Sequence, residues 1–223
     1  MERQVLFDKL SEFLMVEQSG LELYRVAASR CTNPTLKQRY EEFGNETERH
    51  REILITVIEQ MGGDPSYVSP TARLAQVKAA KLLEATLLVD GLSQEEVEAN
   101  DLENLVLAET KDHADWHLLE QVMQQADDED VKRILQQVVG KIEEEEDTHL
   151  QWARETLGQM ALQMVLKGPA PSPERWQKVL TGPIPPIEQG HPALIEEGLL
   201  PLSQQPAWQD TPPVRAVRGR RAA

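Results

Sequence analysis

Three glutamates and two histidines stand where helical apolar patterns would place buried side chains, and together they have the chemistry of metal ligands. They are Glu17, His50, Glu109, Glu146 and His149. A buried carboxylate without a partner either shifts its pKa or loses free energy to desolvation, so each glutamate needs a compensating group. A divalent or trivalent cation supplies positive charge and several coordination positions that carboxylate oxygens and imidazole nitrogens fill. These residue types therefore predict a buried metal site.

The segment KIEEEEDTHLQWA, residues 141–153, contains five consecutive acidic residues and then a histidine. Successive residues of an α-helix turn by about 100°, so these carboxylates cannot all face inward. Glu146 and His149 are one turn apart and in line with Ile142 and Ala153, which predicts that they face the core. Glu145 lies at the edge of this face and is an alternative to Glu146. The expected solvent-facing residues of the run are Glu143, Glu144 and Asp147.

The helix that contains His50 departs from this pattern. Thr47 stands three residues before His50, and the nearest carboxylates are Glu46 and Glu48. Glu46 is four residues before His50, which is still one turn away, so we predict that Glu46 completes a weaker position with Glu17 and His50. A single-metal site and a degenerate site remain alternatives at this stage.

Other polar residues near these positions have simpler interpretations. We expect Asp112 and His113 to lie behind the ligands or at the surface, and Tyr24 and Trp116 to be ordinary core residues. Glu17 has an alternative partner in an arginine such as Arg25 or Arg39. His117 and His191 have no group of potential ligands near them in the sequence.

Four long helices must position the candidate ligands, and the sequence predicts them at about residues 3–30, 35–61, 93–125 and 129–165. Each has apolar residues at spacings of three and four, the pattern of a helix with one buried face. Pro34 and the pair Gly62-Gly63 mark helix boundaries, and Ser93 with Glu96 forms a capping-box signature. A shorter helix at about 72–89 is expected to be a crossover. The predicted fold class is all-α.

Composition narrows the classes of function. The formal net charge of −15 over 223 residues argues against nucleic acid or an anionic membrane as a partner, and it favours cations. The single Cys31 permits no internal disulfide and no cysteine-ligated cluster. The first 18 residues lack the apolar region of a signal peptide, and no apolar run reaches the roughly 20 residues of a membrane span. We therefore expect a cytoplasmic protein.

The last quarter of the chain differs from the rest. Eleven of the fourteen prolines follow residue 168, and the end contains Arg215, Arg218, Arg220 and Arg221. This composition predicts a helical domain at 1–167 and a Pro-rich, largely irregular tail at 168–223. The tail is a candidate docking segment for an unidentified protein.

The pattern of ligands resembles the ferritin-like superfamily. Glu146-Asp-Thr-His149 matches the Glu-x-x-His element of its di-iron four-helix bundles, and Glu17 and Glu109 match the single glutamates of the first and third helices. Glu17 and Glu109 are each followed after seven residues by an aromatic residue, Tyr24 or Trp116, as an internal repeat would give. The resemblance covers about residues 3–165 and departs from the family at Thr47.

This resemblance implies a ferritin-like bundle with two iron ions, or manganese, and a homo-oligomeric assembly. The implied ligands are Glu17, Glu46, His50, Glu109, Glu146 and His149. The implied function is oxidation of ferrous iron or consumption of peroxide, with dioxygen or peroxide as the oxidant, in iron handling or oxidative-stress protection. A rubrerythrin-like role would also need a cysteine-ligated iron, which one cysteine cannot build. The alternative is a non-catalytic helical bundle with a degenerate metal site and a tail that binds a partner.

Overall fold

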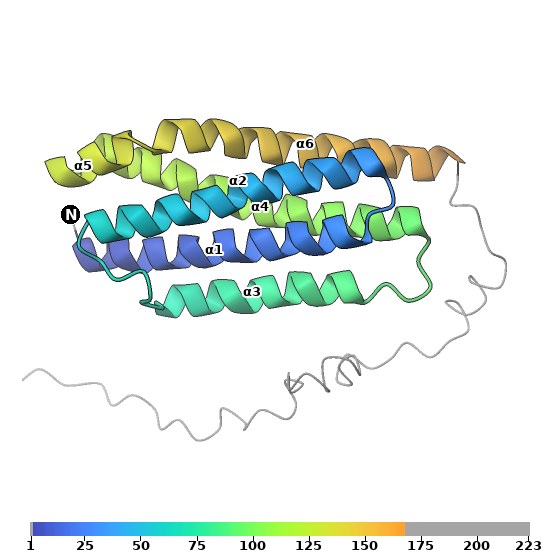
Figure 1. Cartoon of the computed structure of the whole chain (residues 1–223), viewed down its shortest axis with the longest axis horizontal. Helices are drawn as coiled ribbons and strands as arrows, with labels where there is room; N and C mark the ends of the chain where they lie inside the picture. The colour runs from blue at the N-terminus through green and yellow to red at the C-terminus, as the bar shows by residue number, and fades with distance from the viewer. Residues whose placement is uncertain (1, 168–223) are drawn as a thin grey trace, which may run out of the picture. The chain divides into compact units, whose positions relative to one another are not determined.

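A computed structural model describes residues 2–167, and these residues are helical and joined by short connections, with no strand among them. The helices are α1 (Arg3–Arg30), α2 (Pro34–Gln60), α3 (Pro70–Leu87), α4 (Gln94–Gln125), α5 (Glu129–Gln136) and α6 (Val139–Lys167) (Figure 1). The predicted all-α fold class is confirmed. The predicted irregular tail at 168–223 lies outside the described residues.

Local signals in the sequence fix several helix ends. Asn33 precedes α2 with an extended backbone, and its side chain accepts hydrogen bonds from the N–H groups of Thr35 and Leu36. Gly62 follows α2 with a φ of 81°, a conformation that costs a glycine little. Ser93 and Glu96 form both hydrogen bonds of a capping box at the start of α4, as their spacing predicts.

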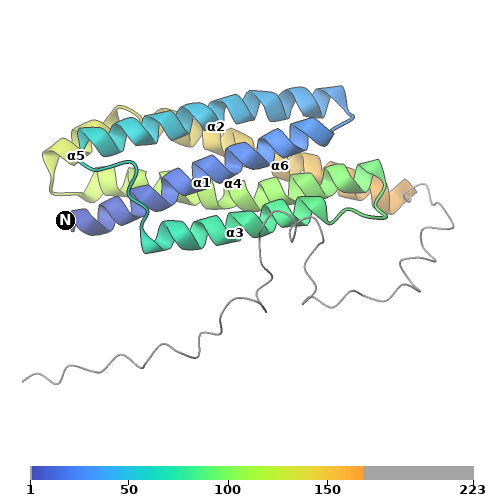
Figure 2. The same cartoon turned by 60° about the horizontal axis from the view of Figure 1, so that its bottom comes forward.

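Two helical hairpins form the bundle. α1 packs against α2, α4 packs against α6, and α1 and α4 join the two pairs. α3 packs on the outer side of α1 and α4 and carries the chain back along the bundle, as Figures 1 and 2 show. α2 and α4 therefore run in the same direction, which a short loop between them would not allow. This arrangement brings the middles of α1, α2, α4 and α6 to one level.

The expected single helix at 129–165 is two helices, which corrects the prediction. α5 ends at Gln136 and α6 begins at Val139, with i to i−3 hydrogen bonds from Gln137 N–H and Val138 N–H between them. The apolar spacing continues through this break, because Val131, Ile134, Leu135, Val139 and Ile142 are all buried. Periodicity alone therefore gave no sign that the helix is interrupted here. α5 covers one end of the apolar core.

The core consists of two apolar clusters on either side of a polar layer. One cluster includes Leu10, Phe13, Leu54 and Trp116, and the other includes Tyr24, Tyr40, Phe43 and Leu102. The candidate ligands occupy the middle of the helices between these clusters. The apolar clusters on either side keep bulk water away from this buried layer of ionisable side chains.

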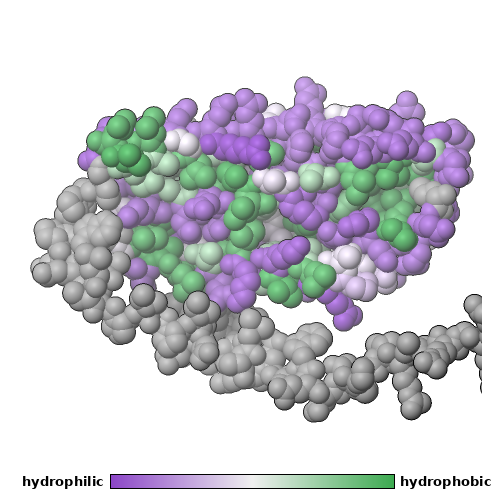
Figure 3. Space-filling view, turned by 180° about the vertical axis from the view of Figure 1, so that it is seen from behind, coloured by the Kyte–Doolittle hydropathy of each residue, from purple (hydrophilic) through white to green (hydrophobic). Residues whose placement is uncertain are grey.

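The surface of the described residues is mixed. Figure 3 shows hydrophilic and hydrophobic side chains interspersed on the face opposite to that of Figure 1. Exposed apolar residues include Leu162, Val165 and Leu166 near the end of α6. Within residues 2–167, none of the helices combines the length and the apolar character that a membrane span requires.

Candidate metal centre

Five of the six predicted ligands lie in the polar layer and are almost completely inaccessible to solvent. The exposed fraction is 2% for Glu109 and 0% for Glu17, His50, Glu146 and His149. α1, α2 and α4 each supply one of these residues, and α6 supplies Glu146 and His149, one turn apart. The structure thus brings together residues that are up to 132 positions apart in the chain.

The potential donor atoms form two groups that share Glu146. One group is Glu17, His50 and Glu146, and the other is Glu109, Glu146 and His149; within each group one donor atom per residue lies within 4.8 Å of the others. His50 Nδ1 is 2.7 Å from Glu146 Oε1 and 4.0 Å from Glu17 Oε1. His149 Nδ1 is 3.6 Å from both Glu109 Oε2 and Glu146 Oε1.

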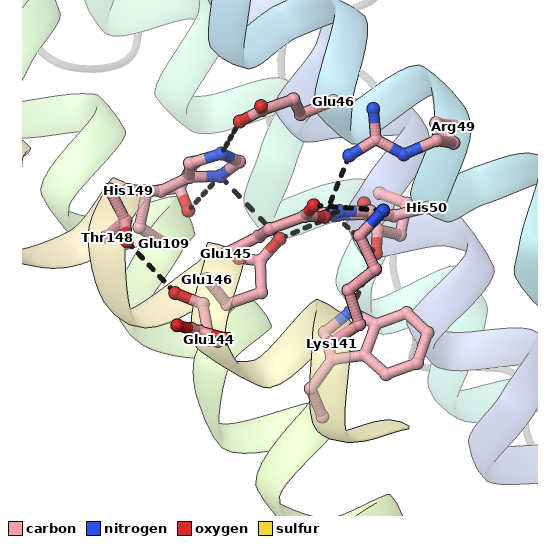
Figure 4. A network of polar contacts seen from close by, with 12 residues as sticks. Glu46, Arg49, His50, Glu109, Lys141, Glu144, Glu145, Glu146, Thr148 and His149 are labelled. Carbon is pink, nitrogen blue, oxygen red and sulfur yellow. Dashed lines mark hydrogen bonds and ion pairs between the residues drawn. The ribbon is translucent and has the colours of Figure 1, made fainter. Parts of the chain in front are cut away.

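Each imidazole is held from behind by a carboxylate of the other hairpin. Glu145 Oε2 lies 2.8 Å from Nε2 of His50, and Glu46 Oε2 lies 2.8 Å from Nε2 of His149 (Figure 4). Glu145 and Glu46 each stand four residues before the other histidine of the pair, so the contacts cross symmetrically between α2 and α6. A carboxylate on the far nitrogen fixes the ring orientation and leaves Nδ1 of each histidine facing the shared glutamate.

Glu46 therefore has a different place from the predicted one. Its carboxylate is outside both donor groups and contacts His149, whereas the sequence suggested a position beside Glu17 and His50. The reason is geometric: a side chain one full turn before His50 but on a neighbouring face points across to α6. Glu145, which sequence reasoning considered as a substitute for Glu146, has the equivalent place on His50.

Two aromatic residues hold the single glutamates in the same crosswise manner. The Tyr24 hydroxyl donates to Glu109 Oε1 at 2.7 Å, and the Trp116 indole N–H donates to Glu17 Oε1 at 2.8 Å. The predicted internal repeat thus corresponds to real contacts, but they run between α1 and α4. A Cβ on Gly44 would lie 3.3 Å from Cβ of Tyr24, so this glycine lets α2 approach α1 closely beside the layer. Tyr24 and Trp116 are core residues that also orient carboxylates.

Several buried donor atoms of the layer have no hydrogen-bond partner among the described residues. They are Glu17 Oε2, His50 Nδ1, Glu109 Oε2, Asp112 Oδ1, both carboxylate oxygens of Glu146 and His149 Nδ1. Buried polar atoms are normally paired, and leaving one unpaired costs roughly 1–3 kcal/mol. Four of the seven, His50 Nδ1, Glu109 Oε2, Glu146 Oε1 and His149 Nδ1, meet one another as ion pairs at 2.7 to 3.6 Å. A bound cation could satisfy the remaining lone pairs of the layer.

Asp112 is buried in the layer but outside both donor groups, and it contacts Glu17, in line with the expectation that it lies behind the ligands. Its side chain is 4% exposed, and its unpaired Oδ1 belongs to the same layer. Asp112 stands three residues after Glu109, which is the spacing of Glu146 and His149. Thr47 stands three residues before His50, as Glu146 stands three residues before His149. It is 1% exposed and provides no carboxylate.

The charges in the layer are poorly compensated without a cation. Burial is the main cause that raises the pKa values of Glu17, Asp112 and Glu146 well above their ordinary range, and repulsion between neighbouring carboxylates adds to it. Burial also acts on Glu109, but contacts with His149 and with the Tyr24 hydroxyl outweigh it and lower the pKa of Glu109. The ion pairs of Glu17, Glu109 and Glu146 within residues 2–167 are all with histidines.

The pKa values of His50 and His149 shift in opposite directions. Burial lowers the pKa of His50 to about 4, despite its contact with Glu145. Burial also opposes protonation of His149, but Glu109 and Glu46 outweigh it and raise the pKa of His149. The arginines suggested as alternative partners of Glu17 are engaged elsewhere: Arg25 pairs with Glu48, and Arg39 pairs with Glu42. A neutral imidazole, or one whose proton a metal ion can displace, could hold a metal ion together with the carboxylates that it faces.

Comparison with known protein families gives one match. Residues 1–152 match the model of a family described as a domain of unknown function, DUF892. The chain belongs to the DUF892 family. The DUF892 match extends from α1 to Trp152 in α6, so it includes both donor groups. No curated protein and no solved structure matches the chain.

Proposed function

We propose that this DUF892 protein is ferritin-like, that its buried layer binds two iron or manganese ions, and that it oxidises ferrous iron or consumes peroxide. The observation that carries the proposal is the convergence, from four helices, of buried carboxylate oxygens and imidazole nitrogens that have no other partner among the described residues than one another. A mixed shell of carboxylate oxygens and imidazole nitrogens suits iron and manganese. Ferritin-like di-iron proteins have the same ligand types in these bundle positions, apart from Thr47, where their pattern has a glutamate.

The two donor groups assign the ligands. Glu17 and His50 would hold one ion and Glu109 and His149 the other, and Glu146 could contribute to both because it belongs to both groups. Asp112 offers a further oxygen from α4. When bound, iron in such an anionic shell would supply the electrons that reduce dioxygen or peroxide.

Residues around the layer would fix its geometry. Glu46 and Glu145 hold the imidazole rings, while Tyr24 and Trp116 hold Glu109 and Glu17. These supporting contacts reduce the reorganisation that binding requires, because the donor atoms already face one another. The two apolar clusters keep bulk water from the layer.

Thr47 supports a second candidate function. A symmetrical site would have a carboxylate three residues before His50, and the buried Thr47 removes it. The layer would then hold one ion that stabilises the bundle without redox chemistry. This candidate differs from the first in the number of ions bound and in the absence of ferrous oxidation.

Metal content and oxidation kinetics distinguish these functions. Protein purified without chelator is expected to contain close to two iron or manganese ions per chain and to accelerate oxidation of added ferrous iron. Glu109→Gln keeps an acceptor for the Tyr24 hydroxyl but removes a charged ligand, so we expect loss of one ion and at least about a tenfold lower oxidation rate. Glu103→Gln, at an exposed position of α4, is the matched control.

The outcomes separate clearly. Unchanged metal content and oxidation in Glu109→Gln would refute the assignment of this layer. One ion per chain in the wild type, without accelerated oxidation, would favour the structural role associated with Thr47. Circular dichroism of both variants establishes that they are folded.

A further inference from the structure

A second group of histidines and carboxylates lies on the outer face of α4 and α6. His113 and His117 are four residues apart on α4, and Glu143 and Asp147 are four residues apart on α6. Residues at this spacing share one face of a helix. His113 Nε2 lies 2.6 Å from Asp147 Oδ1, and His117 Nδ1 lies 2.9 Å from Glu143 Oε1. Two imidazole–carboxylate pairs therefore connect the helices, one turn apart.

The His117 pair has a third potential donor. Glu120 Oε2 is 3.5 Å from His117 Nδ1, and the donor atoms of His117, Glu120 and Glu143 all lie within 4.8 Å of one another. The side chains of these residues are 49%, 30% and 20% exposed, so a hydrated ion can reach them. The rings of His113 and His117 are nearly parallel, with centroids 6.4 Å apart and an interplanar angle of 6°.

The charge around this group favours a cation. Within the described residues, the ion pairs of Glu120 and Glu143 are both with His117, and neither carboxylate pairs with a lysine or an arginine. Arg154 lines the groove beside His113 and Asp147, but it is eleven residues beyond Glu143, or roughly 16 Å along α6 at 1.5 Å per residue. The His117 end is thus the more negative end.

We propose that His117, Glu120 and Glu143 bind a divalent transition-metal ion at the surface, with water completing its coordination. An imidazole and two carboxylates from two helices match the preferences of zinc, manganese and ferrous iron. The site is separate from the buried layer, although Glu143 precedes Glu146 by only one turn. It does not depend on the function proposed for that layer. Sequence reasoning assigned no partner to His117: Glu120, three residues later, was visible in the sequence, whereas Glu143 approaches only through the packing of α6 on α4.

Zinc binding tests this site directly. Metal-free full-length protein is titrated with Zn²⁺ in competition with a chromophoric chelator, while the imidazole C–H signals are followed by NMR. We expect the His117 signal to shift and saturate. His117→Ala and Glu143→Gln should each weaken one zinc-binding event by at least about tenfold, which is the scale of losing a ligand contact.

Two controls separate this site from the buried one. Glu144→Gln alters a neighbouring exposed carboxylate of α6 and should leave zinc binding unchanged. The surface event should also persist in Glu146→Gln, which removes the carboxylate shared by the two buried groups. A His117 signal that does not respond to zinc, or equal zinc stoichiometry and affinity in wild type and folded His117→Ala, would overturn the proposal.

Discussion

Replacement of Glu146 by glutamine should have opposite effects on the metal-free and the metal-bound protein. In the metal-free protein, Glu146 is 0% exposed and lies among Glu17, Glu109 and Asp112, whose charges add to burial in raising its pKa. A neutral amide of similar shape removes this repulsion. We therefore expect metal-free Glu146→Gln to melt at a higher temperature than the metal-free wild type.

The metal-bound protein should lose stability through the same substitution. A ligand at 100 times its Kd stabilises the folded state by about 2.7 kcal/mol, so two bound ions contribute about 5 kcal/mol. For a protein of this size, 1 kcal/mol corresponds to a Tm change of about 2–4 °C, which gives a total shift of about 10–20 °C. Glu146 belongs to both donor groups, so its loss weakens both ions. Most of this shift should disappear.

Thermal melting with and without Mn²⁺ measures both effects at neutral pH. Glu144→Gln is the control, because it changes an exposed carboxylate of the same helix. An equal rise in Tm with Mn²⁺ for Glu146→Gln and the wild type would show that Glu146 is not a shared ligand. A folded, metal-free Glu146→Gln that melts well below the metal-free wild type would show that repulsion between carboxylates does not limit the stability of the metal-free layer.

Three further predictions follow from the surroundings of the layer. Glu145→Gln should weaken Mn²⁺ binding by about 10–100-fold, because Glu145 orients His50, and equilibrium titration showing wild-type affinity would contradict this role. Trp116→Phe removes the indole donor to Glu17 and should cost at least about 1–3 kcal/mol in urea-induced unfolding, whereas an unchanged free energy of unfolding would show that this hydrogen bond is replaced. The Tm of the metal-free protein should fall as the pH rises above 6.5. Above pH 6.5 the raised pKa of His149 means that the folded state holds a proton that the unfolded state has lost. The raised pKa values of Glu17, Asp112 and Glu146 act in the same direction, beginning above the ordinary pKa of a carboxyl group. His50, with its pKa lowered to about 4, contributes its pH dependence only below 6.5. Bound Mn²⁺ should flatten this pH dependence, and a metal-free Tm that rises from pH 6.5 to 8.5 would contradict the argument.

Much of the fold could be predicted because its signals are local. Asn33-Pro34, Gly62 and the Ser93 capping box act within one turn of chain, and the apolar spacing of each long helix reports which face is buried. The break between α5 and α6 was not predictable in this way. Its apolar residues keep the same spacing on both sides, so the pattern is the same whether the helix continues or is interrupted at residues 137 and 138.

The position of the candidate site was also visible in the sequence, because ionisable residues on an apolar face need a partner in the folded protein. Residue types and spacing determined that Glu17, His50, Glu109, Glu146 and His149 face inward. They did not determine how the four helices rotate against one another. The contacts of Glu46 and Glu145 depend on that rotation, as does the proximity of His117 to Glu143.

The buried face of each helix is predictable from the chain, because helical periodicity is a property of one segment. Which donor atoms meet, and which nitrogen of each imidazole remains available, depends on how the helices pack together. That packing also places Asp112 in the layer, where an unpaired oxygen faces the other carboxylates. Such contacts join residues about a hundred positions apart, and their geometry is set by the packing of α1, α2, α4 and α6 and not by any single helix.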